Sequence, residues 1–107
     1  MMIDDFGRKV EGYWYSQHSP KYPKPIPNVL TAEQANKIAN LIKAAQRGAT
    51  KTQYRGSSIS RIDKTRVGSA EYSKGDWIWP DGFGEHYVRK YRVKPSDEFL
   101  QFIGYTE

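Results

Sequence analysis

Residues 77–99 read WIWPDGFGEHYVRKYRVKPSDEF, and this stretch decides the fold. It holds two of the three tryptophans, two tyrosines, one of the two histidines, and four lysines or arginines within six positions. Trp77 and Trp79 alternate with Ile78, which is the two-residue period of a β-strand. Pro80-Asp81-Gly82 is a turn sequence, and a helical spacing of aromatic residues follows it. The stretch therefore predicts a strand, a tight turn and a helix with a basic edge.

The alternation also assigns the strand residues to faces. Trp77 and Trp79 share one face, and we expect both in the core, with Ile78 turned to solvent. The alternative is a partly exposed tryptophan face that contacts a partner, as aromatic residues at interfaces do.

Two short helices are predicted within residues 83–103. In the first, residues 83–92, Phe83, Tyr87 and Tyr91 recur every four residues and should pack inward. The second should dock on the core through a group of apolar residues, namely Phe99, Leu100, Phe102 and Ile103. Both helices would then lie against the strand that precedes them.

A small antiparallel sheet is predicted upstream, within residues 53–79. Its candidate strands are residues 53–62, 68–72 and 76–79, which are rich in residues that favour strands. Between the last two strands, Ser73-Lys74-Gly75-Asp76 is a hairpin turn in which Gly75 can adopt a positive φ.

A long helix is predicted over residues 32–47. Thr31 and Gln34 have the spacing of a capping box, which satisfies free backbone N–H groups at a helix start. Gly48 should end the helix in the left-handed conformation. The apolar residues recur on one face of this helix: Ala35, Ile38, Leu41, Ile42 and Ala45.

The N-terminal part carries one more predicted strand, at residues 9–15, and a proline-rich connector at residues 19–28. Prolines at 20, 23, 25 and 27 favour an extended surface segment. The alternative is a ligand for an SH3-type groove, because Pro20 and Pro23 have P-x-x-P spacing. We therefore expect residues 1–107 to form one α+β domain. One long helix packs on a small antiparallel sheet, and two short C-terminal helices follow.

Composition narrows the class of function. Residues 51–94 carry ten basic and five acidic residues, within a chain of net charge +5. Such a basic centre is typical of proteins that contact nucleic acid or an acidic protein surface. The chain has no cysteine, so thiol chemistry is excluded. The acidic N-terminus is unlike a signal peptide, and no apolar run could span a bilayer. We expect a cytoplasmic protein without a membrane partner.

The sequence predicts no enzyme and no cofactor. His18 and His86 are the only imidazoles, and neither is accompanied by a nucleophile pattern. The Gly-x-Gly at positions 82–84 lacks the remaining spacing of a phosphate-binding loop. A small nuclease that uses His86 with Glu85 or Asp81 is the least favoured class.

From Tyr54 to the C-terminus the chain resembles a group of small, uncharacterised bacterial and phage proteins. Their pattern is C-x-x-C followed by W-P-(D/E)-G-x-x-x-H-Y, in which the histidine begins an H-x-x-x-H spacing. The resemblance rests on these matching residues: Arg55, Gly56, Ser58, Arg61, Gly68, Ser69, Glu71, Tyr72, Gly75, Trp79, Pro80, Asp81, Gly82, His86, Tyr87, Val93, Pro95, Glu98 and Phe99. It implies a shared fold and lineage, and it implies no particular activity.

The two cysteines and two histidines of that pattern look like a zinc site. In this chain the cysteine positions hold Ser60 and Asp63, and the second histidine position holds Lys90. Only His86 remains, so the resemblance implies a version without metal. An ion pair between Asp63 and Lys90 is expected to replace the zinc.

The favoured function is a small basic binding protein that contacts nucleic acid. The predicted binding residues are Arg55, Arg61, Lys64 and Arg66, with Lys51 beside them, and Arg89, Lys90, Arg92 and Lys94. Trp77, or else Tyr72 or Tyr91, would stack on bases. The alternative is a phage-type inhibitor or adaptor that blocks a bacterial defence complex. The oligomeric state is left open.

Overall fold

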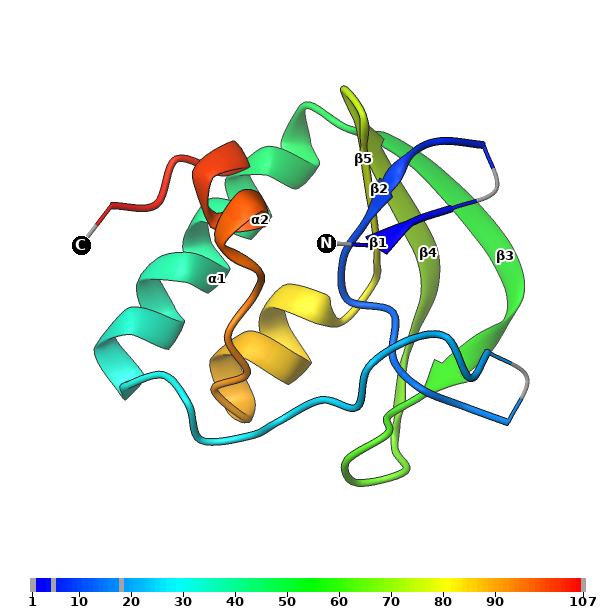
Figure 1. Cartoon of the computed structure of the whole chain (residues 1–107), viewed down its shortest axis with the longest axis horizontal. Coiled ribbons are helices and arrows are strands. Elements are labelled where there is room, and N and C mark those ends of the chain that lie inside the picture. Colours follow the sequence, from blue (N-terminus) through cyan, green and yellow to red (C-terminus); the bar gives the residue numbers. More distant parts are fainter. Residues whose placement is uncertain (1, 5, 18, 107) are drawn as a thin grey trace.

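A five-stranded sheet and a layer of helices make up the molecule (Figure 1). The computed structural model describes residues 2–4, 6–17 and 19–106. The sheet has the order β1-β2-β5-β4-β3, with strands β1 (Met2–Ile3), β2 (Lys9–Val10), β3 (Thr50–Ile59), β4 (Arg66–Lys74) and β5 (Trp77–Pro80). The helices are α1 (Ala32–Arg47), η1 (Phe83–Lys90) and α2 (Asp97–Phe102).

The predicted α+β class and the antiparallel pairing of the strands within residues 53–79 are confirmed, but the parallel pairing of the N-terminal strand was not predicted. β2 runs parallel to β5, while the other three pairings are antiparallel. The predicted strand at residues 9–15 shrinks to Lys9–Val10, because the chain leaves the sheet after that point. Gly12 then passes so close to the Phe83 ring that a Cβ there would lie 2.7 Å from it.

The hairpin from β4 to β5 forms as predicted. Lys74 pairs with Trp77, which leaves Gly75 and Asp76 as a two-residue turn, and Gly75 has a φ of 58°. β4 is longer than the predicted strand, whereas β3 has the predicted length and lies three residues earlier in the chain than predicted. β3 is the edge of the sheet, and the register shifts between Gln53 and Ser58, where Gly56 has a φ of 74°.

α1 has the predicted bounds and the predicted capping box between Thr31 and Gln34. Gly48 ends the helix, but its φ is −98°, so the expected left-handed stop is wrong. α1 packs mainly along η1, and it meets the sheet where the Trp79 Nε1 donates to the Gln46 side chain at 3.2 Å. A Cβ at Gly84 would lie 3.1 Å from Ile42, so glycine lets the two helices approach closely.

η1 is a π-helix, in which backbone N–H groups bond five residues back. Tyr87 bonds to the carbonyl of Gly82, and Tyr91 bonds to that of His86. This wider turn changes which side chains share a face. Phe83 and Tyr87 are buried as predicted, but Tyr91 lies beside His86, with ring centroids 5.1 Å apart. Tyr91 is only half-buried against the core, so the expectation that it packs inward like Tyr87 is confirmed in part.

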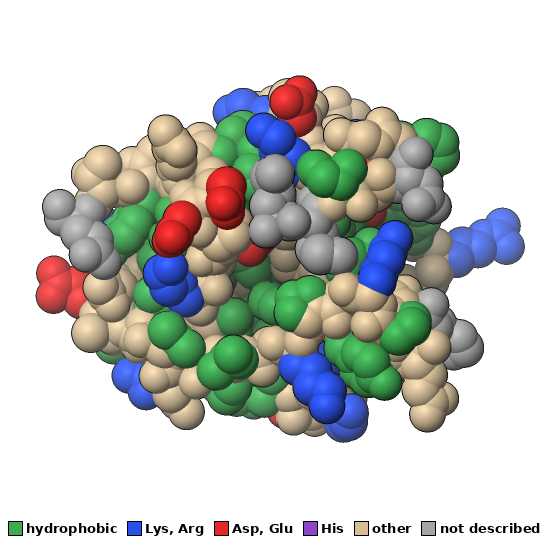
Figure 2. Space-filling model, in the orientation of Figure 1, with side chains coloured by type: hydrophobic (Ala, Val, Ile, Leu, Met, Phe, Trp, Pro, Cys, Tyr) green, Lys and Arg blue, Asp and Glu red, His purple; other side chains and the backbone are tan. Residues whose placement is uncertain are grey.

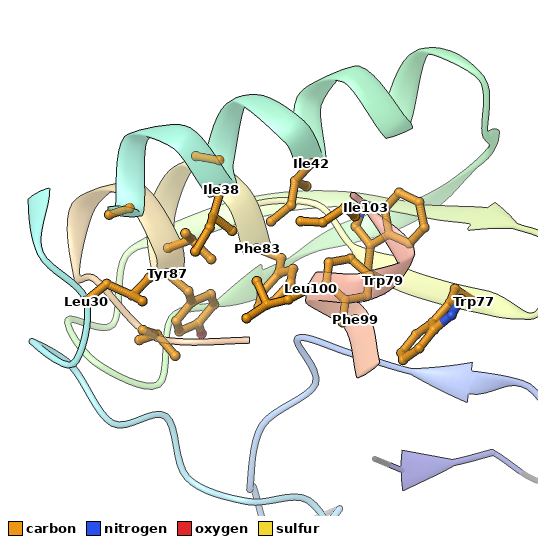
Figure 3. Close-up of a cluster of buried hydrophobic side chains, with 14 residues drawn as sticks. Leu30, Ile38, Ile42, Trp77, Trp79, Phe83, Tyr87, Phe99, Leu100 and Ile103 are labelled. Atoms are coloured by element: carbon orange, nitrogen blue, oxygen red, sulfur yellow. The ribbon is translucent and has the colours of Figure 1, made fainter. Parts of the chain in front are cut away.

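The core lies between the sheet and the helices (Figure 3). Trp77 and Trp79 are both buried and meet the Phe99 ring of α2 edge-on, so the predicted core position of both tryptophans is confirmed. Ile78 is also buried, at 3% exposure, which contradicts the expectation that it faces solvent. Its backbone pairs with Val10 of β2, which is also buried, so the two apolar side chains are neighbours in the sheet.

The proline-rich connector runs along one side of the molecule to the start of α1 (Figure 1). Its backbone is tied at both ends, by the Tyr15 N–H to the Pro23 carbonyl and by the Asn28 N–H to the Tyr91 carbonyl. Within the described residues, no helix is long and apolar enough to cross a membrane.

Candidate nucleic-acid interface

The loop between β3 and β4 is bonded to η1 through side chains, and we call this group the polar latch. It consists of Ser60, Asp63, His86, Lys90 and Tyr91. Ser60 is fully buried and its Oγ lies 2.8 Å from the His86 Nε2. The same oxygen accepts the backbone N–H groups of Ile62 and Asp63, which shapes the loop. The latch therefore fixes the hairpin relative to the helix.

Asp63 is the acceptor at the centre of the latch. Tyr91 donates its hydroxyl to Oδ2 at 2.6 Å, and Lys90 places its ammonium 3.7 Å from the same oxygen. The predicted ion pair between Asp63 and Lys90 is thus confirmed. Hydrogen bonds from the Thr65 hydroxyl and then from Tyr91 hold the pKa of Asp63 well below its usual range. This carboxyl is ionised at neutral pH.

His86 is held within the latch in its neutral form. Burial lowers the pKa of His86 below its ordinary value, and the nearby Asp63 opposes this only in part. Ser60 Oγ and Asp63 Oδ1 both approach the same ring nitrogen, Nε2, at 2.8 and 3.4 Å. A Ser-His-Asp relay needs the two partners on different ring nitrogens. This trio therefore lacks the geometry of a catalytic relay.

The four positions of the zinc-like pattern do come together in space. Ser60, Asp63, His86 and Lys90 all belong to the latch, although the two pairs are more than twenty residues apart in sequence. Among the described residues no group of three or more His, Cys, Asp or Glu side chains could hold a metal. At the positions of the zinc-like pattern, the Lys90 ammonium instead forms an ion pair with the Asp63 carboxylate.

The predicted binding residues fall into two groups according to the contacts that they make. The first group stands on the hairpin, and we call it the basic hairpin: Arg55, Arg61, Lys64 and Arg66. All four are exposed, and within the described residues none has a carboxylate within ion-pair distance. Arg61 is oriented by a bond from its Nε to the Tyr15 carbonyl. Figure 2 shows lysine and arginine side chains projecting at the β3 end of the molecule.

The second group is engaged in contacts that support the fold. Arg89 bonds to Glu85 at 2.8 Å and to Asn36 and Asn40 of α1. Arg92 donates to Asn28 at 3.0 Å, and Lys94 pairs with Asp97 at 2.7 Å. Arg89 thus ties η1 to α1, and Lys90 ties it to the latch. Arg92 bonds to Asn28 of the connector, and Lys94 makes a local ion pair.

Two further predicted contacts lie away from the basic hairpin. Trp77 is only 4% exposed and packs between Phe99 and Phe102, so it has no free ring face for a base. The expectation that Trp77 stacks on bases is therefore wrong. Lys51 lies at the opposite end of β3, roughly 25 Å from the loop at about 3.3 Å per residue. His18 lies outside the described residues.

The outer face of the sheet, opposite the helices, carries residues that sequence reasoning missed. Glu71 on β4 accepts the hydroxyls of Tyr13 and Tyr54, the latter at 2.6 Å. Burial, followed by the bond to Glu71, raises the pKa of Tyr13, so this phenol stays neutral. Tyr54 is exposed on β3, and Glu71 is half-buried on β4. Side chains alternate between the two faces along a strand, and this alternation was the sequence signal that could have located both residues.

Two neighbouring cavities open beside these tyrosines, with volumes of 120 and 310 Å³. They share Tyr13, Ser58 and Pro80 as lining residues, and we call them together the outer groove. Arg61 lines the smaller cavity and Arg55 lines the larger one. The outer groove is thus continuous with the basic hairpin.

Comparison of the chain with protein family models, curated proteins and solved structures finds no match.

Proposed function

We propose that the chain is a non-catalytic protein that binds nucleic acid through the basic hairpin. The observation that carries the proposal is the contrast between paired and unpaired cations. Arg89, Lys90 and Lys94 each have a carboxylate partner, whereas the four residues of the basic hairpin have none among the described residues. A group of cations without carboxylate partners attracts phosphate.

The position of the basic hairpin supports a binding role. Its loop is held by the polar latch, so the cations lie on a structured element, where binding costs little ordering entropy. Arg61 is oriented further through Tyr15. Aromatic side chains lie nearby, and Tyr54 is 53% exposed on β3. Cations beside exposed rings are the combination that nucleic-acid grooves use.

A binding role is favoured over a nuclease because the candidate catalytic groups are engaged elsewhere. Asp81 accepts the Ala70 N–H at 3.2 Å and so holds the Pro-Asp-Gly turn against β4. His86 is occupied by Ser60 and Asp63. We retain the cytoplasm as the location, since nucleic acid is present there.

The experiment compares two variants with the same change in net charge. Lys64→Glu with Arg66→Glu alters the basic hairpin, while Lys37→Glu with Lys43→Glu alters exposed positions of α1. Fluorescence anisotropy with a labelled oligonucleotide should show at least about a tenfold loss of affinity for the hairpin variant at about 50 mM salt. The α1 variant should bind within about threefold of the parent chain. Equal losses, or no binding by the parent chain, would contradict the proposal.

One observation favours the alternative of a protein inhibitor or adaptor. β3 is an edge strand whose ten residues are all exposed, and its two charged residues, Lys51 and Arg55, are basic. An extended acidic segment of a partner protein would pair with such an edge. A pull-down from bacterial lysate with and without nuclease separates the two functions. A protein partner that survives nuclease treatment would favour the alternative.

A further inference from the structure

The outer groove lies between two segments that are distant in sequence. Residues 12–16 and 19–22 form one wall, and the β3–β4 hairpin forms the other, with Pro80 and Asp81 also lining the smaller cavity. Figure 1 shows residues 12–17 and 19–22 passing beside the lower ends of β3 and β4. The groove is therefore a feature of the folded chain and is invisible in any local sequence pattern.

Aromatic rings line the groove on the side of residues 12–16 and 19–22. Tyr13 and Tyr22 stack on each other with ring centroids 5.8 Å apart and an angle of 29°. Both tyrosines line the smaller cavity, and Trp14 lines it beside them. The Trp14 Nε1 is buried and has no acceptor among the described residues.

Hydroxyl groups and guanidinium groups line the opposite wall. Arg61 and Ser58 belong to the smaller cavity, and Arg55, Ser57 and Ser58 belong to the larger one. Both arginines are exposed members of the basic hairpin. Guanidinium and hydroxyl donors are the groups that bind phosphate oxygens. The groove thus has rings along one wall and phosphate donors along the other.

Two carboxylates also touch the groove, and both are already engaged. Glu71 accepts the hydroxyls of Tyr13 and Tyr54, which fixes the orientation of these two phenols. Asp81 accepts the Ala70 N–H. Because Glu71 repels phosphate, a nucleic-acid backbone should follow the arginine wall and its bases should point toward the tyrosines.

We infer that the nucleic acid bound at this site is single-stranded. This inference rests on the proposed function and names the class of its ligand. A cavity of 120 Å³ beside stacked tyrosines has room for an unstacked base, whereas the bases of a duplex are already stacked on each other. Every base has an aromatic face, so the groove should tolerate different sequences.

The test compares a labelled oligothymidine with a duplex of equal length by fluorescence anisotropy. The parent chain should bind the single strand about tenfold more tightly than the duplex. Tyr22→Ala should weaken single-strand binding by about tenfold and leave duplex binding unchanged, because it removes a ring and no charge. Tyr22→Phe keeps the ring and should retain single-strand affinity. Tyr105→Ala makes the same truncation of a half-buried tyrosine outside the groove, so it controls for loss of stability.

The outcomes separate this inference from the proposed function. If duplex and single strand bind equally, or if Tyr22→Ala and Tyr105→Ala behave alike, the single-strand inference is overturned while binding by the basic hairpin stands. If neither nucleic acid binds, both are overturned. Circular dichroism of each variant establishes that the fold is intact before binding is compared.

Discussion

The two faces of the sheet differ in their role: the inner face packs against the helices, and the outer face borders the groove that we propose as a binding site. On the inner face, Trp77 and Trp79 pack against Phe99 and leave no accessible ring. On the outer face, the neighbouring position Glu71 gathers Tyr13 and Tyr54 beside an open groove. Trp77 and Trp79 are therefore used for packing, whereas the strand residue Tyr54 stays accessible. The stretch that decides the fold is distinct from the surface that we propose as the binding site.

The polar latch connects these two faces. It ties the loop of the β3–β4 hairpin, which carries the outer cations, to η1, which belongs to the inner core. Changes on the inner face should therefore affect the free energy of unfolding. Changes on the outer face should affect binding, and changes in the latch should affect both.

The largest effect is expected from Trp79→Ala on the inner face. Removing this fully buried ring should lower the free energy of unfolding by about 3–5 kcal/mol, measured by urea denaturation. Tyr54→Ala on the outer face should change it by less than about 0.5 kcal/mol, because that ring is largely exposed. Similar losses in the two variants would break the distinction between the faces.

The next effect is expected in the latch, from Ser60→Ala. The substitution leaves the backbone N–H groups of Ile62 and Asp63 without their acceptor and His86 without its partner. We expect a loss of about 1–3 kcal/mol in the free energy of unfolding. Ser57→Ala, an exposed serine of the same hairpin, is the matched control and should be nearly neutral. An equally neutral Ser60→Ala would show that the latch contributes nothing.

A smaller effect is expected when the charge of Lys90 is reversed. Lys90→Glu places two carboxylates in contact at Asp63 and should lower the melting temperature by about 4–8 °C, which corresponds to about 1 kcal/mol. Lys43→Glu on α1 makes the same charge change away from any latch residue and should have little effect. Adding Asp63→Lys to Lys90→Glu should restore part of the loss.

The recovery from that double variant should be incomplete, since Asp63 also accepts bonds from Thr65 and Tyr91. A double-mutant cycle isolates the pairwise part of the energy. A coupling energy of zero would show that the ion pair between Asp63 and Lys90 does not contribute to the free energy of unfolding.

The smallest effect is expected in the pH dependence of stability. Because the folded state lowers the pKa of His86, the unfolded chain binds a proton more readily below the ordinary value of 6.5. Stability should therefore fall as the pH decreases from about 7 to about 5. The pKa of Asp63 is also lowered, so a further loss should begin near its ordinary value of 3.8. In urea titrations, His86→Gln should flatten the upper step alone, and an unchanged upper step would exclude His86 as its source.

Local sequence signals predicted the local structure well. The capping box at Thr31 fixed the start of α1, and Gly75 fixed the two-residue turn between β4 and β5. The parallel pairing of β2 with β5 depends on a contact between residues 9–10 and 77–78 that no local pattern encodes. The π-helix was missed because a spacing of four residues predicts an α-helix, and the five-residue bonds of η1 then moved Tyr91 next to His86.

The candidate site was predictable only in part. The run of cations was evident in the sequence, but the groups that these cations contact were not. Arg89 bonds to Asn36 and Asn40 of α1, which lie about fifty positions earlier in the chain. The zinc-like spacing correctly brought Asp63 and Lys90 together. The outer groove depends on residues 12–16 and 19–22 crossing the sheet, so Tyr13 and Tyr22 gave no signal before the fold was known.

The most direct test of the central claim is the salt dependence of single-strand binding. The logarithm of the dissociation constant should be measured against the logarithm of the salt concentration for the parent chain and for Lys64→Glu with Arg66→Glu. If these two cations contact phosphates, the slope should fall by about 1.4, at about 0.7 for each lost contact. An unchanged slope would contradict the claim that the basic hairpin binds nucleic acid.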